Sequence, residues 1–206
     1  MKIYGYSTSR SMRAVWAAEE AGLDFEYIEV QMGSDEQNGS RSKEYLAINP
    51  QGKVPSMVDG EVTITESGAI VNYIASKAAD SNLIPADGTA LRARYDEICY
   101  FVFTELEQPL WSNGKHRFAL PEEVRIPEMV TTTAPFEFAK AQKALLTLLG
   151  DSTYAVGDSF TMADVHLAHT ISWAEKFEFD VDAKLLDYRN KMMQREAFAK
   201  AKARLA

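Results

Sequence analysis

The chain has 206 residues and a formal net charge of −8 at pH 7. This length supports one domain or two small ones, each able to bury a core. The acidic balance argues against a general nucleic-acid surface, because phosphate binding needs clustered Lys and Arg. The single cysteine, Cys99, excludes an intramolecular disulfide and a CxxC redox pair, and with three scattered histidines it gives no metal-ligand spacing.

No stretch of the sequence approaches the roughly twenty apolar residues of a membrane-spanning helix. The N-terminus has Lys2 followed by a strand pattern, and it lacks the apolar stretch of a signal peptide. We therefore expect a cytoplasmic protein with neither a membrane nor a nucleic acid as partner.

Hydrophobic periodicity alternates between strand and helix in the first half of the chain. It predicts a strand at Lys2–Tyr6, a helix at about Ser11–Ala21 and a strand at Phe25–Val30. A polar loop, a hairpin and a helix over Ser67–Ala79 follow. The order β-α-β and then β-β-α, with a right-handed crossover, predicts a thioredoxin-like domain with a four-stranded sheet over residues 1–79.

The hairpin is the segment most informative about a ligand. Val54-Pro55 opens a strand, Asp59-Gly60 is a two-residue turn, and the returning strand leads to Glu66-Ser67 at a helix start. If the bond before Pro55 is cis, the N–H and C=O of Val54 turn away from the sheet and can pair with an extended peptide. Ser67 lies at a helix N-terminus, which favours a carboxylate.

Turn-forming residues from 79 to 88 mark a domain boundary, with a linker at 80–88. Beyond it, apolar residues recur at helical spacing, which predicts an all-α domain over residues 89–206. The broken segment Ser112–Pro135 contains three prolines and is expected to hold short helices and loops. The longer helices are expected at Leu91–Trp111, Phe136–Leu149, Met162–Lys176 and Ala183–Arg204.

The segment from Thr161 to Asp164 is typical of a capping box at a helix start, with Asp standing where Glu or Gln is more usual. Gly157-Asp158 supplies the turn before it. We interpret Thr161 and Asp164 as structural, because such a cap typically contributes ~1 kcal/mol to stability.

These motifs occur in an order that resembles the cytosolic glutathione transferases over nearly the whole chain. The resemblance is to bacterial, serine-type, theta-, zeta- and phi-like members. The shared features are the first strand, a Ser-rich turn followed by Arg13 and a helix, the Val54-Pro55 hairpin, Glu66-Ser67 and the segment GDSFTMAD. The resemblance implies the glutathione transferase architecture, an α/β thioredoxin-like N-terminal domain followed by an all-α C-terminal domain.

The resemblance also implies that glutathione binds to the hairpin as a co-substrate. Val54 and Pro55 would hold its cysteinyl segment, and Glu66 and Ser67 would hold its γ-glutamyl end. Lys53 or Gln51 would lie near the same region or near the glycine carboxylate. Without the neighbouring Val54-Pro55, the pair Glu66-Ser67 would be interpreted as an ordinary helix cap.

A transferase must hold the glutathione thiol as a thiolate, which is the nucleophile. Lowering the thiol pKa by about two units requires ~2.7 kcal/mol, which one charge-assisted hydrogen bond and a helix N-terminus can supply without a general base. By resemblance, Ser9 aligns with the reactive serine of theta- and delta-like enzymes, and we assign it as catalytic. Thr8 aligns with the zeta-like serine, and Tyr6 is a further alternative. Arg10 stands where beta-like enzymes have cysteine, which disfavours a cysteine-type mechanism.

Arg13 has two interpretations, a structural ion pair under the first helix or a positive charge that supports the thiolate. By the same resemblance, the second substrate would lie between the domains. The candidate residues for its pocket are Arg10, Met12, Phe103, Trp111 and His116.

The expected function is conjugation of glutathione to a small apolar electrophile by a metal-free homodimer with a role in detoxification. The dimer would pack through the helix after the hairpin and the first long helix of the second domain. The alternatives are another glutathione-dependent reaction, such as dehalogenation, isomerisation or peroxide reduction, and a non-catalytic scaffold.

Overall fold

The computed structural model describes residues 1–78 and 81–206. They form two compact units, of which the first combines Met1–Ile84 with Met193–Ala206 and the second is Pro85–Met192. The first unit contains a mixed sheet and four helices among its described residues, and the second is helical. This is the predicted architecture of a thioredoxin-like domain followed by an all-α domain.

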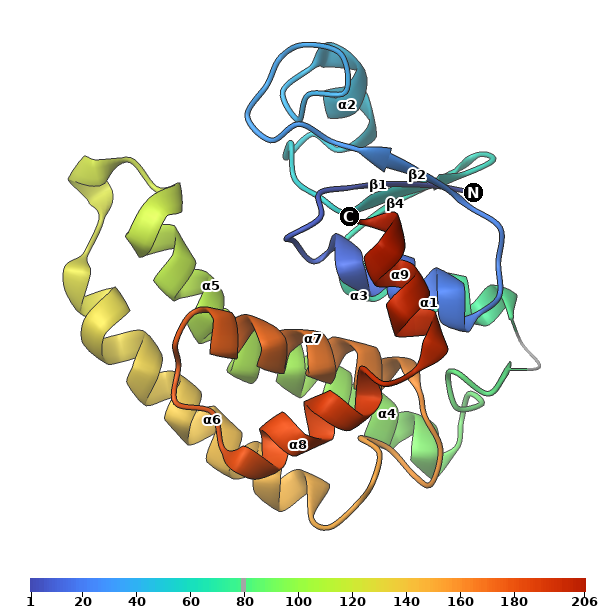
Figure 1. Ribbon diagram of the computed structural model, residues 1–206, viewed down its shortest axis with the longest axis vertical. Coiled ribbons are helices and arrows are strands. Elements are labelled where there is room, and N and C mark those ends of the chain that lie inside the picture. Colours follow the sequence, from blue (N-terminus) through green and yellow to red (C-terminus); the bar gives the residue numbers. More distant parts are fainter. Residues whose placement is uncertain (79–80) are drawn as a thin grey trace. The chain divides into compact units, whose positions relative to one another are not determined.

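The first unit is built on a four-stranded sheet with the strand order β2-β1-β3-β4 (Figure 1). The pair β1–β2 is parallel, whereas β1–β3 and β3–β4 are antiparallel. Gly60, with φ of +61°, lies in the two-residue turn between paired Asp59 and Val62, as its lack of a Cβ permits. The strands are β1 Lys2–Gly5, β2 Glu26–Glu29, β3 Ser56–Asp59 and β4 Val62–Thr65.

Two helices cover one face of this sheet. Helices α1 (Ser11–Glu20) and α3 (Ser67–Lys77) pack against each other, and their buried apolar faces include Val15 and Ile70. The helix predicted at Ser67–Ala79 is observed at Ser67–Lys77. Ala79, the last residue of the prediction, lies outside the described residues.

A short helix, α2 (Lys43–Ile48), occupies part of the segment expected to be a polar loop. Ser42 caps it, because its hydroxyl accepts the Tyr45 N–H at 3.1 Å. Figure 1 shows α2 on the side of the sheet away from α1. Six residues are too few for helical periodicity to be separated from loop composition, which explains why the pattern did not predict it.

The last helix belongs to the first unit. The predicted helix Ala183–Arg204 is broken into α8 (Ala183–Met192) and α9 (Glu196–Arg204), and α9 packs on α1 (Figure 1). The ring of Phe198 meets Trp16 edge-on at 4.8 Å, and Arg195 donates two hydrogen bonds to Glu20, at 2.6 and 2.8 Å. The expected division at 1–79, 80–88 and 89–206 thus differs from the observed one, because residues 193–206 pack with the first unit.

The second unit is a helical bundle around α7 (Met162–Lys176), whose predicted bounds match the structure. The side chains of Met162, Leu167 and Ile171 on this helix are wholly buried. No helix in the described part of the chain is long and apolar enough to span a membrane. The other long helices are α4 Ala90–Phe101, α5 Glu107–Gly114, α6 Ala134–Leu149 and α8. Short helical turns lie at Val102–Leu106, Lys115–Ala119, Glu122–Val124 and Met129–Thr133.

The predicted capping box starts α7. The buried Asp164 carboxylate accepts hydrogen bonds from the Thr161 N–H at 2.7 Å, the Ala155 N–H at 2.8 Å and the Tyr188 hydroxyl at 2.6 Å. Burial raises the pKa of Asp164, and these donors oppose the rise. Asp164 thus joins the start of α7 to the loop before it and to α8.

We expect Asp164→Ala to lower the free energy of unfolding by roughly 2–4 kcal/mol, because it leaves buried donors without an acceptor. Thr161→Ala, which removes one capping hydroxyl, should cost only ~1 kcal/mol. Urea denaturation followed by circular dichroism measures both. A loss from Asp164→Ala no greater than that from Thr161→Ala would contradict the network role.

Candidate functional site

The sheet register brings three turns of the chain to one edge of the first unit. Tyr4, near the end of β1, pairs with Ser56 at the start of β3, and Ser56 pairs with Thr65 at the end of β4. The hydroxyl-rich turn after β1, the Val54-Pro55 segment before β3 and Glu66 after β4 therefore lie close together. This edge is the candidate site.

The peptide bond between Val54 and Pro55 is cis, the isomer expected to turn the Val54 N–H and C=O away from the sheet. Strand pairing of β3 begins at Ser56, and within residues 1–78 and 81–206 neither the N–H nor the C=O of Val54 has a hydrogen-bond partner. Val54 is half-buried. Its backbone groups are thus placed to pair with an external extended peptide.

A buried network that the sequence reasoning missed holds this segment. The Tyr45 hydroxyl and the Asn49 side-chain amide donate to the Lys53 carbonyl, at 2.6 and 2.8 Å. Both also contact the Ser56 hydroxyl, at 3.0 and 3.2 Å. Asn49-Pro50 is a turn signal in the sequence, but the role of Tyr45 depends on α2, which was not predicted.

Lys53 and Gln51, of which one or the other is expected near the γ-glutamyl region or the glycine carboxylate, both have exposed side chains beside this network. The Gln51 N–H donates to the Asn49 side-chain oxygen at 3.0 Å, which fixes the turn that precedes Lys53.

Glu66 and Ser67 start α3 with unlike surroundings. Glu66 is exposed and has φ of +69° and ψ of 117°, which is a strained conformation for a residue with a Cβ. Ser67 is only 6 % exposed, and its hydroxyl accepts a hydrogen bond at 3.3 Å from Arg13, which is wholly buried. The guanidinium of Arg13 therefore links the first turn of α1 to the N-terminus of α3.

The serines of the turn after β1 form a local network. The Ser9 hydroxyl donates to the Tyr6 carbonyl at 2.6 Å and accepts the Ser11 N–H at 3.1 Å. The Ser9 and Ser11 hydroxyls lie 2.8 Å apart, and the Ser11 hydroxyl also accepts the Tyr6 N–H at 3.1 Å. Because the single Ser9 hydroxyl proton points to a carbonyl, Ser11 is the donor of the pair. In this arrangement Ser9 orders the start of α1.

The side chains of Thr8 and Tyr6 are more exposed than that of Ser9. The Thr8 side chain is exposed, and among the described residues its hydroxyl has no hydrogen-bond partner. Tyr6 is 37 % exposed. The structure thus brings all three predicted hydroxyl residues to the same turn, with Thr8 free to donate and Ser9 engaged.

The residues expected around the second substrate fall in both units. Arg10 and Met12 lie at the start of α1, whereas Phe103, Trp111 and His116 lie in the helical unit. The Phe103 ring packs on His166 at 4.8 Å, and His116 accepts the Ile126 N–H at 3.1 Å through Nδ1. Phe103 and His116 therefore each have a packing or hydrogen-bonding partner within the helical unit.

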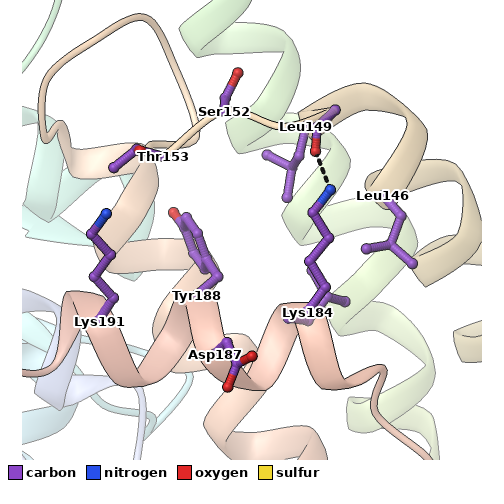
Figure 2. Close-up of a pocket in the computed structure, with 10 residues that line it drawn as sticks. Leu146, Leu149, Ser152, Thr153, Lys184, Asp187, Tyr188 and Lys191 are labelled. Atoms are coloured by element: carbon purple, nitrogen blue, oxygen red, sulfur yellow. Dashed lines mark hydrogen bonds between the residues drawn. The ribbon is translucent and has the colours of Figure 1, made fainter.

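The helical unit has a separate hollow of about 220 Å³ between the end of α6 and α8 (Figure 2). Leu146, Leu149 and Tyr188 line it, and Lys184 closes one side by donating to the Gly150 carbonyl at 2.6 Å. The Tyr188 hydroxyl is committed to Asp164, and burial raises the pKa of Tyr188 well above its ordinary value. None of the predicted site residues is among the described residues that line this hollow.

The part of the chain that the structure describes contains no group of three or more His, Cys, Asp or Glu residues that could hold a metal ion. The candidate site instead offers backbone pairing groups, hydroxyls, a carboxylate and a buried guanidinium, which suits an organic ligand with peptide and carboxylate groups.

Two family models match the chain. The glutathione S-transferase N-terminal domain matches residues 1–76, and the glutathione S-transferase C-terminal domain matches residues 129–196. Glutathione S-transferase Z2 of Arabidopsis thaliana is 32% identical over 175 residues, which cover 83% of this chain and 75% of the relative. A glutathione S-transferase of Silene vulgaris is 28% identical over 98% of this chain and 97% of its own length.

Solved structures agree with these matches. A bacterial enzyme described as the glutathione S-transferase BphK in a ternary complex has a TM-score of 0.86 and 25% identity, over 100% of this chain and 99% of its own. A sphingomonad glutathione S-transferase complexed with glutathione has a TM-score of 0.85 and 28% identity, over 100% and 98%.

The strained backbone at Glu66 indicates that glycine at this position stabilises the fold. Glu66→Gly should raise the free energy of unfolding by about 1 kcal/mol, because glycine adopts a positive φ without steric cost. Glu61→Gly, at an exposed hairpin position without positive φ, should give no gain. Urea denaturation compares the two variants, and equal changes in both would show that Glu66 is not strained.

Proposed function

Because the chain belongs to the glutathione S-transferase family, we propose that it binds glutathione at the β1–β3–β4 edge and conjugates it to a small apolar electrophile. The observation that carries this proposal is the unpaired Val54 backbone between the hydroxyl-rich turn and the start of α3. A site of this form supplies pairing groups for a peptide, a carboxylate and a thiol within one edge of the sheet.

In the proposed complex, the N–H and C=O of Val54 pair with the backbone of the cysteinyl residue, as in the addition of a short strand. The γ-glutamyl end carries one carboxylate and one ammonium group. Ser67 and the N–H groups at the start of α3 would receive the carboxylate, and the exposed Glu66 would receive the ammonium. Lys53 or Gln51, whose side chains are exposed, would lie near the same region or near the glycine carboxylate.

The thiol of bound glutathione would lie at the turn after β1. A hydroxyl that donates to the sulfur stabilises the thiolate and lowers the thiol pKa. Ser9 is our first assignment, and to donate to sulfur it must release the Tyr6 carbonyl. Thr8 can donate without breaking a bond within the described residues. Tyr6 is the third candidate.

The proposal includes a cytoplasmic homodimer with a role in detoxification. In support of a partner surface, Leu91 and Tyr100 on α4 are 52 % and 67 % exposed, and α4 lies within the segment expected to form the dimer. Sedimentation velocity on the sample used for ligand binding tests the oligomeric state.

Calorimetry with glutathione is the experiment that tests the function. We expect saturable binding by the wild-type protein, and the thiolate absorbance of the complex should appear at a pH well below that of free glutathione. Ser67→Ala should weaken binding by roughly tenfold, because one hydrogen bond to a charged group contributes ~1.5–3 kcal/mol. The absence of glutathione binding by the folded wild-type protein would refute the proposed function.

The two leading hydroxyls can be separated by substitution. If Ser9 donates to the sulfur, Ser9→Ala should raise the pKa of the bound thiol and lower turnover, and Thr8→Val should leave both unchanged. Ser9→Ala should also cost ~1 kcal/mol of stability, because Ser9 accepts the Ser11 N–H. The thiolate titration therefore decides the assignment, and the reverse result assigns the role to Thr8.

A further inference from the structure

We propose that Tyr45 and Asn49 are positioning residues that aim the Val54 N–H at the glutathione peptide, an inference that rests on the proposed function. Neither side chain needs to touch glutathione for this role. Both act through the Lys53 carbonyl, on which their donors converge at 2.6 and 2.8 Å.

The planarity of the Lys53–Val54 peptide group links the position of the Lys53 carbonyl to the direction of the Val54 N–H. The Lys53 carbonyl and the Val54 N–H belong to the same trans peptide group, since the cis bond is the next one along the chain. In a trans peptide the C=O and N–H are coplanar and point in opposite directions. Two donors that hold the carbonyl toward Tyr45 and Asn49 therefore turn the Val54 N–H to the other side, where the described residues offer it no acceptor.

The network also fixes the far side of Val54-Pro55. The Tyr45 hydroxyl proton is used on Lys53, so the bond of 3.0 Å between Tyr45 and Ser56 has Ser56 as donor. The second Asn49 amide proton goes to the Ser56 oxygen at 3.2 Å. The same two side chains thus hold Lys53 and Ser56. Val54 and Pro55 are therefore fixed from both sides.

The network is buried and complete, which makes it rigid. Tyr45 and Asn49 are each 3 % exposed, and Ser56 is fully buried. The remaining acceptor of Asn49, its side-chain oxygen, receives the Gln51 N–H. Water therefore does not compete for these bonds, and a saturated network at low dielectric holds one geometry.

The test is Tyr45→Phe, which removes the hydroxyl and keeps the ring that lies 5.9 Å from the ring of Tyr4. We expect the glutathione Kd to rise at least tenfold, while the pKa of the bound thiol and kcat at saturating glutathione stay at wild-type values. Asn49→Asp is the second variant, because it keeps the acceptor for Gln51 and loses both donors. It should weaken binding in the same way.

The matched control is Tyr73→Phe, which deletes a hydroxyl bonded at 3.0 Å to Asp59 at the opposite end of β3. It should leave the glutathione Kd unchanged. All variants are compared at temperatures where circular dichroism shows a folded protein. Hydrogen exchange of the Val54 amide in the ligand-free protein gives a readout independent of binding, and it should change in Tyr45→Phe and Asn49→Asp but not in the control.

Two results would overturn the inference. Wild-type glutathione affinity in folded Tyr45→Phe and Asn49→Asp would show that the network does not position Val54. An equal loss of affinity in Tyr73→Phe would show a general effect of stability. Both results are distinguishable from failure of the proposed function, in which the wild-type protein itself does not bind glutathione.

Discussion

The candidate site depends on Ser56, the residue at which four parts of the first unit meet. Its backbone pairs with β1 at Tyr4 and with β4 at Thr65, and its buried hydroxyl contacts α2 through Tyr45. It also follows the cis proline Pro55 directly. A fully buried hydroxyl must be hydrogen-bonded to be tolerated, and here its partners are the side chains that hold the Lys53 carbonyl. The strand register and the exposed Val54 backbone are therefore fixed together.

Arg13 is a second buried polar residue whose hydrogen bonding constrains the site. Arg13 is fully buried, and the high desolvation cost of a buried guanidinium is offset by hydrogen bonds. One of its hydrogen bonds goes to Ser67, so the N-termini of α1 and α3 are joined beneath the site. Two helix N-termini and an interior cation lie on this side of the sheet, which favours a negatively charged ligand. These positive groups lie together in a chain whose net charge is −8.

The sequence predicted the features that depend on local signals. The hairpin turn that contains Gly60 and the start of α7 at its capping box each have a signature within a few residues, whereas the cis bond at Pro55 entered only as a condition. Helix α2 was not predicted, because it is short and begins in a polar segment. The role of Tyr45 was lost with it, since that role exists only once α2 faces the strand that carries Ser56.

Other features could not be predicted because periodicity does not identify a packing partner. An apolar stripe continues through α8 and α9, and nothing in the pattern shows that α9 leaves the helical unit and that Phe198 packs on Trp16 within the first unit. Similarly, the sequence placed several hydroxyls at the turn after β1, but only the geometry shows that the Ser9 hydroxyl is directed at the Tyr6 carbonyl. Which hydroxyl bonds to which group depends on the side-chain rotamers, and sequence spacing does not determine these.

The return of α9 to the first unit has a consequence for synthesis on the ribosome. Arg195 and Glu20 are separated by 175 positions in the sequence, and the whole helical unit is translated between them. The nascent N-terminal unit must therefore wait, with the Trp16 face of α1 uncovered, until the last helix emerges. Such a long-range closure is slow compared with local helix formation, and an uncovered apolar face on a nascent chain is a target for chaperones. The first unit is thus completed only after α9 has been made, although residues 1–84 are translated before the helical unit.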